Sequence, residues 1–230
     1  MTVAAGARRL GEASSIEVDE AEGRIVVVPL GATEQHGPHL PLDTDTVIAT
    51  AVSAGLAARL PGCWLAPALA YGASGEHQDF PGTCSIGHEA LRVVLVELVR
   101  SLSTWAAEVV LVNGHGGNAP TVAAVVEQMR GEGHRVSWVP CAVAGADPHA
   151  GRVETSLMLH LRREAVRVEH IEPGNTTALG ELLPELRARG VAALSPNGVL
   201  GDPRGATAAE GERLLAEMVD RAAARLETAA

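Results

Sequence analysis

The feature that most constrains this chain is an apolar run at residues 25–30 that leads directly into a polar cluster. The run reads IVVVPL, and a Val-rich segment without polar interruptions is typical of a strand buried on both faces. The carboxylates and imidazoles that follow it are Glu34, His36, His39, Asp43 and Asp45. In open α/β sheets, ligands bind beyond the carboxyl ends of the strands. We therefore interpret this cluster as a candidate site and not only as a solvated loop.

Two further apolar runs lead into polar clusters in the same way. Residues 108–112 read EVVLV and run into NGHGGN, while residues 135–140 precede DPHAGRVETS. A shorter apolar segment at 63–69 is a fourth candidate strand, with Pro67 near its end. Because polar residues follow a strand each time, we expect them to form one composite active site.

Helical periodicity occupies the segments between these strands. Apolar residues at three- and four-residue spacing predict helices at about 45–60, 87–105 and 155–163, one that starts near Asn118, and a last one at 207–226. Strands that alternate with helices predict an α/β fold with three α/β/α layers and a mostly parallel central sheet. The length of 230 residues suits one domain, which we place at residues 1–230.

Local signals refine this picture at a few positions. Asn118 can cap the helix that follows it, with Pro120 in the first turn, and Thr207 with Glu210 forms a capping box. A short helix is expected near residues 7–13. Residues 164–205 hold four prolines and no clear periodicity, so we expect irregular chain that shapes the substrate site or contacts another subunit.

Charge and hydropathy limit the possible partners. The formal net charge is −10, and all eighteen basic residues are arginine. A chain without a basic patch is poorly suited to neutralise phosphates, so we expect no nucleic-acid partner. The N-terminus lacks the apolar core of a signal peptide, and no apolar run approaches the ~18 residues of a membrane span. We therefore expect a cytoplasmic protein with no membrane partner.

The candidate ligands are carboxylates and imidazoles without thiolates, namely Glu34, His36, Asp45, His115 and Glu154. Such sets bind Zn²⁺, Mn²⁺ or Fe²⁺, and the ligand types do not decide among them. A carboxylate can bridge two ions, and two-metal sites activate water while they polarise a carbonyl. Other chemistries have weaker signals, because the chain has neither the Lys nor the GxGxxG pattern of a phosphate cradle and no serine in a GxSxG elbow.

Four spaced motifs, TEQHGPHLPLDTD, EHQDFPGT, NGHGGN and HAGRVETS, resemble those of the creatininase (creatinine amidohydrolase) family. The resemblance covers about residues 26–205. It implies an α/β hydrolase of amide C–N bonds that holds two divalent ions per subunit (Zn, Fe or Mn) and forms a homo-hexamer. It also implies residue roles: metal ligands at Glu34, His36, Asp45 (bridging) and His115, a catalytic histidine at His149, and a substrate contact at Ser74.

One position departs from the family pattern. Creatininase itself carries a glutamate two residues after the histidine of its NGH motif, where this chain has Gly117. Glu154 is the nearest motif carboxylate that can serve the second ion, and we expect it to act in catalysis as well. The remaining expected substrate contacts are Glu76, His77, Gly116 and Gly117.

The short length and the Ala- and Arg-rich composition are similar to family members of the mycofactocin system. Those members are peptidases that trim the modified C-terminal part of a ribosomally made precursor peptide. We therefore expect a peptidase that acts on a small modified peptide, with extra room at Gly117. Tyr71 and Phe80 are either aromatic contacts of the peptide or ordinary core residues. The alternatives are an amidohydrolase acting on a small cyclic or formyl amide, and a non-catalytic metal-bound binding or structural subunit.

Overall fold

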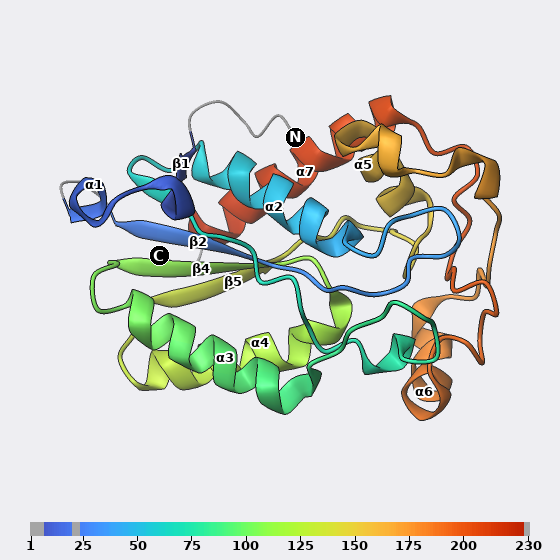
Figure 1. The fold of residues 1–230 in the computed structure, drawn as a ribbon, viewed down its shortest axis with the longest axis horizontal. Coiled ribbons are helices and arrows are strands. Elements are labelled where there is room, and N and C mark those ends of the chain that lie inside the picture. The colour runs from blue at the N-terminus through green and yellow to red at the C-terminus, as the bar shows by residue number, and fades with distance from the viewer. Residues whose placement is uncertain (1–6, 20–23, 228–230) are drawn as a thin grey trace.

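A parallel five-stranded sheet forms the centre of the molecule (Figure 1). The computed structural model describes residues 7–19 and 24–227. The strands are β1 (Arg8–Arg9), β2 (Ile25–Leu30), β3 (Cys63–Leu65), β4 (Glu108–Asn113) and β5 (Val136–Pro140), in the order β1-β3-β2-β4-β5. Every neighbouring pair is parallel, so the carboxyl ends of the strands share one edge. The predicted fold class is confirmed.

Helices cover both faces of the sheet, as Figure 1 shows. The helices that do so are α2 (Thr44–Ala57), α3 (Gly87–Leu102), α4 (Ala119–Gly131), α5 (Arg152–Leu161) and α7 (Ala208–Glu227). Side chains alternate along each strand, so Val27 and Val110 pack with α2, α5 and α7. Val26 and Leu111 point the other way and pack with α3 and α4. The sheet therefore has an apolar core on each face.

Helix α7 packs closely on α5, and a glycine permits this contact. A Cβ on Gly211 would lie 1.9 Å from the carbonyl oxygen of Ser156. The predicted capping box is half formed, because the Glu210 N–H donates to Thr207 Oγ1 at 3.1 Å. The Glu210 carboxylate does not return to the Thr207 N–H; it accepts hydrogen bonds from Arg152 and Ser156 at 2.9 and 3.0 Å. It therefore ties the two helices together.

The structure corrects two predicted elements. The strand expected at 63–69 ends at Leu65, and only Leu69 pairs again, as an isolated bridge to Leu30. Pro67 explains the break, because proline has no N–H to offer the sheet. Residues 7–13 form no α-helix; Arg8 and Arg9 form the short edge strand β1, and a 3-10 turn, η1 (Leu10–Glu12), follows.

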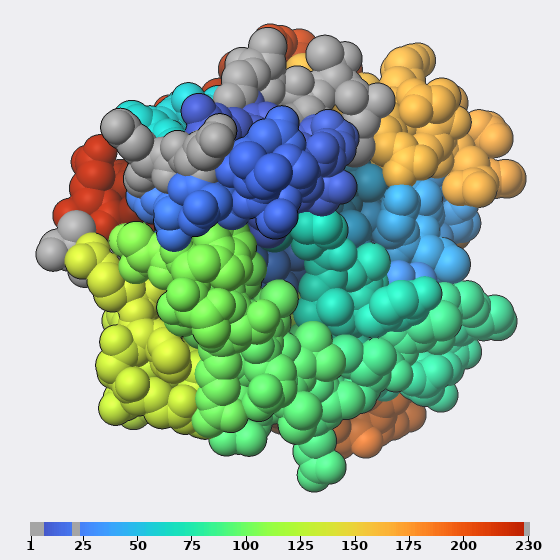
Figure 2. Space-filling model, turned by 60° about the vertical axis from the view of Figure 1, so that its left-hand side comes forward, coloured from blue at the N-terminus to red at the C-terminus, as the bar shows by residue number. Residues whose placement is uncertain are grey.

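The first described segment covers the amino-terminal side of the sheet. After η1 it forms the short helix α1 (Ser15–Asp19), and Leu10 and Val18 pack against the core beneath α3 and α4. Figure 2 shows this segment in blue beside the green end of α3. The polar clusters lie at the opposite, carboxyl edge of the sheet. Within the described residues, no helix is long and apolar enough to cross a membrane.

Asn118 has a role that differs from the predicted one. It makes no capping hydrogen bond to α4, although Pro120 lies in the first turn as expected. Its Nδ2 donates to the carbonyl of Gly31 at 3.0 Å, and its Oδ1 accepts from the Ala73 N–H at 2.8 Å. The turn η3 (Gly116–Asn118) therefore links the loops after β2 and β3 to the end of β4.

Residues 164–205 are more ordered than their prolines suggested. They contain the turns η4 (Arg163–Ala165) and η5 (Val168–His170) and the eleven-residue helix α6 (Leu179–Arg189). Pro184 and Gly180 both lower helix propensity, which hid α6 from a reading of periodicity. Figure 1 shows α6 beyond the carboxyl ends of the strands, beside the loop that carries η2 (Gly75–His77).

Candidate metal centre

The structure brings the five predicted ligands together at the carboxyl edge of the sheet. Glu34 and His36 lie in the loop after β2, and His115 directly follows β4. Asp45 and Glu154 lie in the first turns of α2 and α5. The first four are nearly inaccessible, with at most 5% of each residue exposed. Three separate strand ends thus contribute to one cluster, and the role of these residues as ligands stays a prediction.

The first group of side chains surrounds His115. Glu34 Oε2 lies 3.2 Å from Nε2 of His115, and Asp45 Oδ2 lies 3.4 Å from Nδ1 of the same ring. One ligand atom from each of these three residues lies within 4.8 Å of the others. Such spacing suits three ligands around one ion.

The second group surrounds His36 and shares Asp45 with the first. His36 Nε2 lies 3.1 Å from Asp45 Oδ1 and 3.9 Å from Glu154 Oε2. These three residues also place ligand atoms within 4.8 Å of one another. The two oxygens of Asp45 therefore face different groups, which is the geometry of a carboxylate that bridges two ions.

Three buried oxygens support a metal at this place. Both carboxylate oxygens of Glu34 and Oδ2 of Asp45 accept no hydrogen bond from any described residue. A buried carboxylate oxygen without a partner is unfavourable, and charged groups in protein interiors are paired or bind metals. The donor set therefore fits a divalent cation of the Zn, Mn or Fe class.

Without metal, protonated histidines supply the positive charge that balances the buried carboxylates of this cluster. Burial lowers the pKa of His36, but Asp45, Glu154 and Glu34 outweigh burial and raise it to about 10. The same balance, with Glu34 and Asp45 as the main acids, raises the pKa of His115 to about 10. Burial raises the pKa of Glu34, yet the surrounding imidazoles lower it well below its usual value. The acids of this site thus require cations beside them.

Glu154 differs from Glu34 because its pKa is raised. Burial is the main cause, His36 opposes it, and Asp45 acts with it, so that the pKa reaches about 7. The Ala150 N–H donates to Oε2 at 2.6 Å and fixes the carboxyl group. A carboxyl group with this pKa can hold or release a proton near neutral pH.

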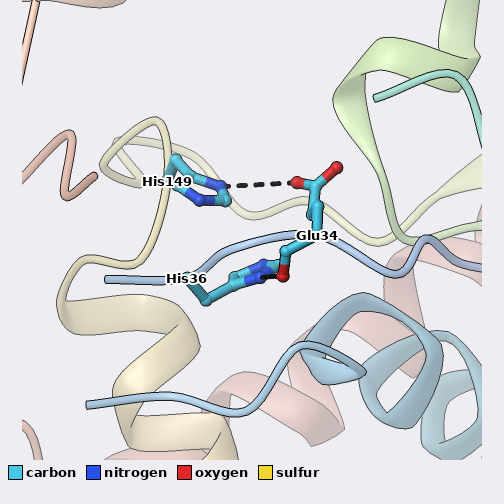
Figure 3. A group of neighbouring side chains, drawn as sticks. All are labelled: Glu34, His36 and His149. Atoms are coloured by element: carbon cyan, nitrogen blue, oxygen red, sulfur yellow. Dashed lines mark hydrogen bonds and ion pairs between the residues drawn. The ribbon is translucent and has the colours of Figure 1, made fainter. Parts of the chain in front are cut away.

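His149 forms a third group with Glu34 and His36, whose ligand atoms also lie within 4.8 Å of one another. Its Nε2 lies 2.8 Å from the Gln35 carbonyl oxygen. Because a carbonyl can only accept, Nε2 carries the hydrogen, and Nδ1 is the basic nitrogen. Nδ1 lies 3.7 Å from Glu34 Oε1, the contact drawn in Figure 3. Burial, with His36 and His77 acting in the same direction, lowers the pKa of His149 well below its usual value, so the ring is neutral.

Gln35 is a site residue that the sequence analysis missed. Its amide nitrogen lies 2.8 Å from His77 Nδ1 and 3.1 Å from His149 Nε2, and it donates to the Gly198 carbonyl at 3.0 Å. Its position between Glu34 and His36 was the only hint in the sequence. In an extended segment Glu34 and His36 project to one side and Gln35 projects to the other, so this alternation argued against a site role for Gln35. Because His149 Nε2–H already donates to the Gln35 carbonyl, the side-chain amide of Gln35 donates to His77 and to Gly198. Gln35 therefore holds His149 through its backbone and links His77 to the segment after α6 through its side chain.

The expected substrate contacts line one cleft above the candidate metal groups. This cleft has a volume of about 670 Å³, and Glu76, His77, Gly116 and Gly117 lie on its wall. Ser74 is fully buried beneath it, with Oγ 3.4 Å from His115 Nε2. The structure thus places four of the five residues on the cleft surface and one below it.

Gly117 does not leave the extra room that was expected. A Cβ at this position would lie 2.4 Å from the Ala73 carbonyl oxygen and 2.7 Å from Glu76 Oε1. The space above Gly117 is therefore filled by neighbouring groups, and the carboxylate of Glu76 is one of them. Glu76 Oε1 is also 3.7 Å from His115 Nε2, so it adds an acidic group beside the first ligand set.

The two aromatic residues lie outside the cleft. Neither Tyr71 nor Phe80 lies on the wall of the cleft. Tyr71 is half exposed on the surface, and Phe80 packs against a small apolar cluster with Leu182 of α6. Helix α6, which sequence periodicity did not reveal, contributes Leu179, Leu183 and Leu186 to the apolar part of the wall.

Two members of the first polar cluster lie outside the candidate ligand groups. His39 Nε2 lies 2.9 Å from Thr155 Oγ1, and Asp43 accepts from Arg162 at 2.7 Å. Both connect the loop after β2 to α5 or its end. Their contacts support the loop that carries Glu34 and His36.

Known proteins resemble this chain over most of its length. A family model described as "Creatininase: Creatinine amidohydrolase" matches residues 11–226. A "Mycofactocin precursor peptide peptidase" of Mycobacterium ulcerans is 56% identical over 209 residues, which are 87% of this chain and 84% of the relative. A protein of the same name from Mycobacterium tuberculosis is 54% identical over 220 residues, 92% of this chain and 87% of the relative.

The fold has solved counterparts as well. A structure described as "Creatininase Mn" has a TM-score of 0.79 and 26% sequence identity, and the match covers 96% of this chain and 98% of that chain. Coverage this complete means that the two chains share the fold over nearly their whole length.

Proposed function

The chain belongs to the creatininase (creatinine amidohydrolase) family, and from this premise we propose that it is a metal-dependent peptidase of the mycofactocin system. Its substrate is a small precursor peptide whose modified C-terminal part it trims. The relatives named mycofactocin precursor peptide peptidase support this assignment, because they match more than four fifths of the chain at 54–56% identity. The cleft beside the candidate ligands supports it too, since it offers space beyond that needed by a small amide.

The observation that carries the hydrolase assignment is the position of Asp45. Its two oxygens face two different groups of ligands, each completed by one histidine and one glutamate. We propose two divalent ions per subunit, drawn from Zn, Fe and Mn. One would be held by Glu34, Asp45 and His115, and the other by His36, Asp45 and Glu154. When bound, such ions polarise an amide carbonyl and lower the pKa of a water molecule.

The residues of the chain supply proton transfer and orientation. His149 is neutral with its basic Nδ1 toward the cluster, so it can take a proton from the attacking group and return it to the leaving nitrogen. The Gln35 carbonyl holds Nε2–H and thereby keeps this tautomer. Glu154 would serve as a ligand of the second ion, and the Ala150 N–H fixes its carboxyl group for this role. Ser74, Glu76, His77, Gly116 and Gly117 contact the substrate in this proposal.

The test compares wild-type protein with His149→Ala on three substrates. The substrates are a mycofactocin-type precursor peptide after its C-terminal modification, creatinine, and a formylated aminopyrimidine, with products followed by mass spectrometry. The wild type should release a short C-terminal fragment from the peptide. His149→Ala should keep its metal and lose at least ~10²-fold in rate. His134→Ala, at a half-buried histidine that does not line the cleft, serves as the matched control.

Each other outcome has a distinct meaning. Full activity in metal-replete His149→Ala protein would move the proton-transfer role to another group, with His77 next in line. Fast turnover of creatinine or of the formyl amide without peptide cleavage would contradict the peptidase assignment. Bound metal without turnover of any amide would favour a non-catalytic binding subunit.

A further inference from the structure

Helix α6 presents one face to the cleft. Leu179, Leu183 and Arg187 are four residues apart, so they lie along one side of the helix, and all three line the cleft. Leu182 points elsewhere and is only 6% exposed, in the apolar cluster that fixes α6 to the fold. Leu179, in contrast, is 42% exposed. The helix thus carries one apolar side that is packed and a second that faces open space.

Arg187 is one of the few arginines in the described part of the chain that no other side chain pairs. Acidic residues outnumber basic ones by 28 to 18, and most arginines in the described part of the chain contact a carboxylate, an oxygen of another group or an aromatic ring. Arg187 has no such partner among residues 7–19 and 24–227, whereas its neighbour Arg189 pairs with Glu185 at 2.7 Å. The cleft therefore contains a positive charge that no described side chain neutralises.

The two walls of the cleft differ in charge. The loops and helix starts that follow the strands contribute the carboxylates Asp45, Glu76, Asp79 and Glu154, and α6 contributes Arg187 and Arg189. The walls are held in register, because the Val191 N–H just after α6 donates to the Glu76 carbonyl at 2.8 Å. A ligand anchored at the ligand cluster can thus extend along α6 to a group of opposite charge.

The dimensions favour a peptide over a small amide. Eight residues separate Leu179 from Arg187, which is about 12 Å along a helix at 1.5 Å per residue. An extended peptide covers this distance with about four residues at ~3.3 Å each. A compact amide bound at the candidate metal groups cannot contact both ends of this face.

We propose that the cleft-facing side of α6 selects the peptide substrate, with Leu179 and Leu183 receiving an apolar side chain and Arg187 binding a carboxylate of the peptide. The inference rests on the proposed function and specifies its substrate as an extended peptide with an apolar residue and a carboxylate about four residues apart or fewer. The carboxylate is a side chain of Asp or Glu or the C-terminal group.

The test is a double-mutant cycle between Arg187 and the peptide. A parent peptide is compared with a series in which each Asp or Glu is replaced by its amide, one at a time, and with a C-terminal carboxamide. One member of the series should raise KM of the wild type about tenfold with little change in kcat, as expected when a charged partner is removed from a binding contact. Arg187→Gln should raise KM of the parent peptide by a similar factor. For this variant, replacing the same carboxylate of the peptide by its amide should leave KM unchanged. The responding member identifies which carboxylate is bound.

Three controls separate this contact from general charge effects. Arg213→Gln changes an exposed arginine of α7 outside the cleft and should leave KM unchanged. Arg189→Gln should have a smaller effect than Arg187→Gln, because Glu185 already compensates Arg189. Leu183→Asn should also raise KM of the parent peptide while the response to the carboxylate replacement persists. Peptide affinity measured in the His149→Ala background should show the same order, since binding there does not depend on turnover.

The outcomes distinguish the inference from the proposed function. If the wild type cleaves the parent peptide and Arg187→Gln has the same KM, the α6 inference is wrong and the peptidase assignment stands. If the wild type cleaves no peptide but turns over a small amide, the peptidase assignment fails and the α6 inference fails with it.

Discussion

Among single residues, Asp45 is the one shared by both candidate metal groups. It is 2% exposed, its two oxygens face two histidines, and Oδ2 accepts no hydrogen bond from the described residues. One side chain that serves two ions should be needed for both. We therefore expect Asp45→Ala protein to lose most of its bound metal, as measured by elemental analysis after dialysis. Asp43→Ala removes a carboxylate two residues away that pairs with Arg162, and it should keep its metal. Unchanged metal content in Asp45→Ala protein would refute the bridging role.

His39 gives a prediction about acid stability. It is fully buried, and its Nδ1 has no hydrogen-bond partner among the described residues. Burial, together with the nearby charge of His36, lowers the pKa of His39 to about 4 from an ordinary value of 6.5. Between these pH values the unfolded chain binds a proton at this position and the folded chain does not. The free energy of unfolding should therefore decrease as pH falls from 6.5 to 4.

The His39 contribution can be isolated in metal-free protein. His39→Gln keeps a polar side chain that can reach Thr155, and it removes the titrating ring. Its denaturation midpoint in urea should change less between pH 6.5 and 4 than that of the wild type. An equal slope in the two proteins would assign the acid sensitivity to other groups, of which His77, with a pKa lowered to about 4 by burial, is the first candidate.

At the level of elements, α6 should be the least firmly held helix around the cleft. Its anchor is the small cluster of Leu182, Val191 and Leu200, with Phe80 packed against it, whereas α3 packs into a large core. Leu182→Ala removes a buried side chain, a change that costs about 2–5 kcal/mol where the whole fold depends on it. Here the loss should act locally, by making α6 open more often.

Limited proteolysis with trypsin can detect this opening, because α6 contains Arg187 and Arg189. Leu182→Ala should accelerate cleavage after these two residues while the midpoint of thermal unfolding changes little. Leu95→Ala, in the fully buried core of α3, should do the reverse and lower the unfolding midpoint without selective cleavage in α6. Equal behaviour of the two variants would show that α6 unfolds only with the whole protein.

The elements also show what could be predicted from the sequence. Buried strands such as β2 and β4 are continuous apolar runs, and the edge they share followed from strands that alternate with helices. Residues that bond across long separations could not be read in this way. Gln35 contacts His149, which is 114 residues away in the sequence. Asn118 forms hydrogen bonds to two loops and does not cap its helix. Helix α6 was missed because Pro184 and Gly180 weaken its local signal and tertiary packing supplies the rest.

For the whole molecule, we propose that residues 1–230 form one domain and that six copies assemble into a homo-hexamer. The two apolar cores lie on opposite faces of one sheet and share its strands, so neither core can form as a separate domain. Multi-angle light scattering at micromolar concentration should give about six times the subunit mass of 23.7 kDa. A monomeric mass under these conditions would contradict the assembly. In that case, residues 164–205 would shape the substrate site and would have no role in subunit contacts.

The position of α6 in the chain also bears on how this fold diversifies. Residues 164–205 connect α5 to α7 and contribute no strand to the sheet. They contain none of the candidate metal ligands. Gly198 and Leu200 of this segment hold Gln35 and His149, so the exchangeable part is α6 itself. Recombination between relatives can replace that helix without altering the catalytic groups. A family that inherits one hydrolytic centre can therefore acquire new substrates through exchange of this helix, and chimeric proteins built at its two ends offer a direct route to engineered specificity.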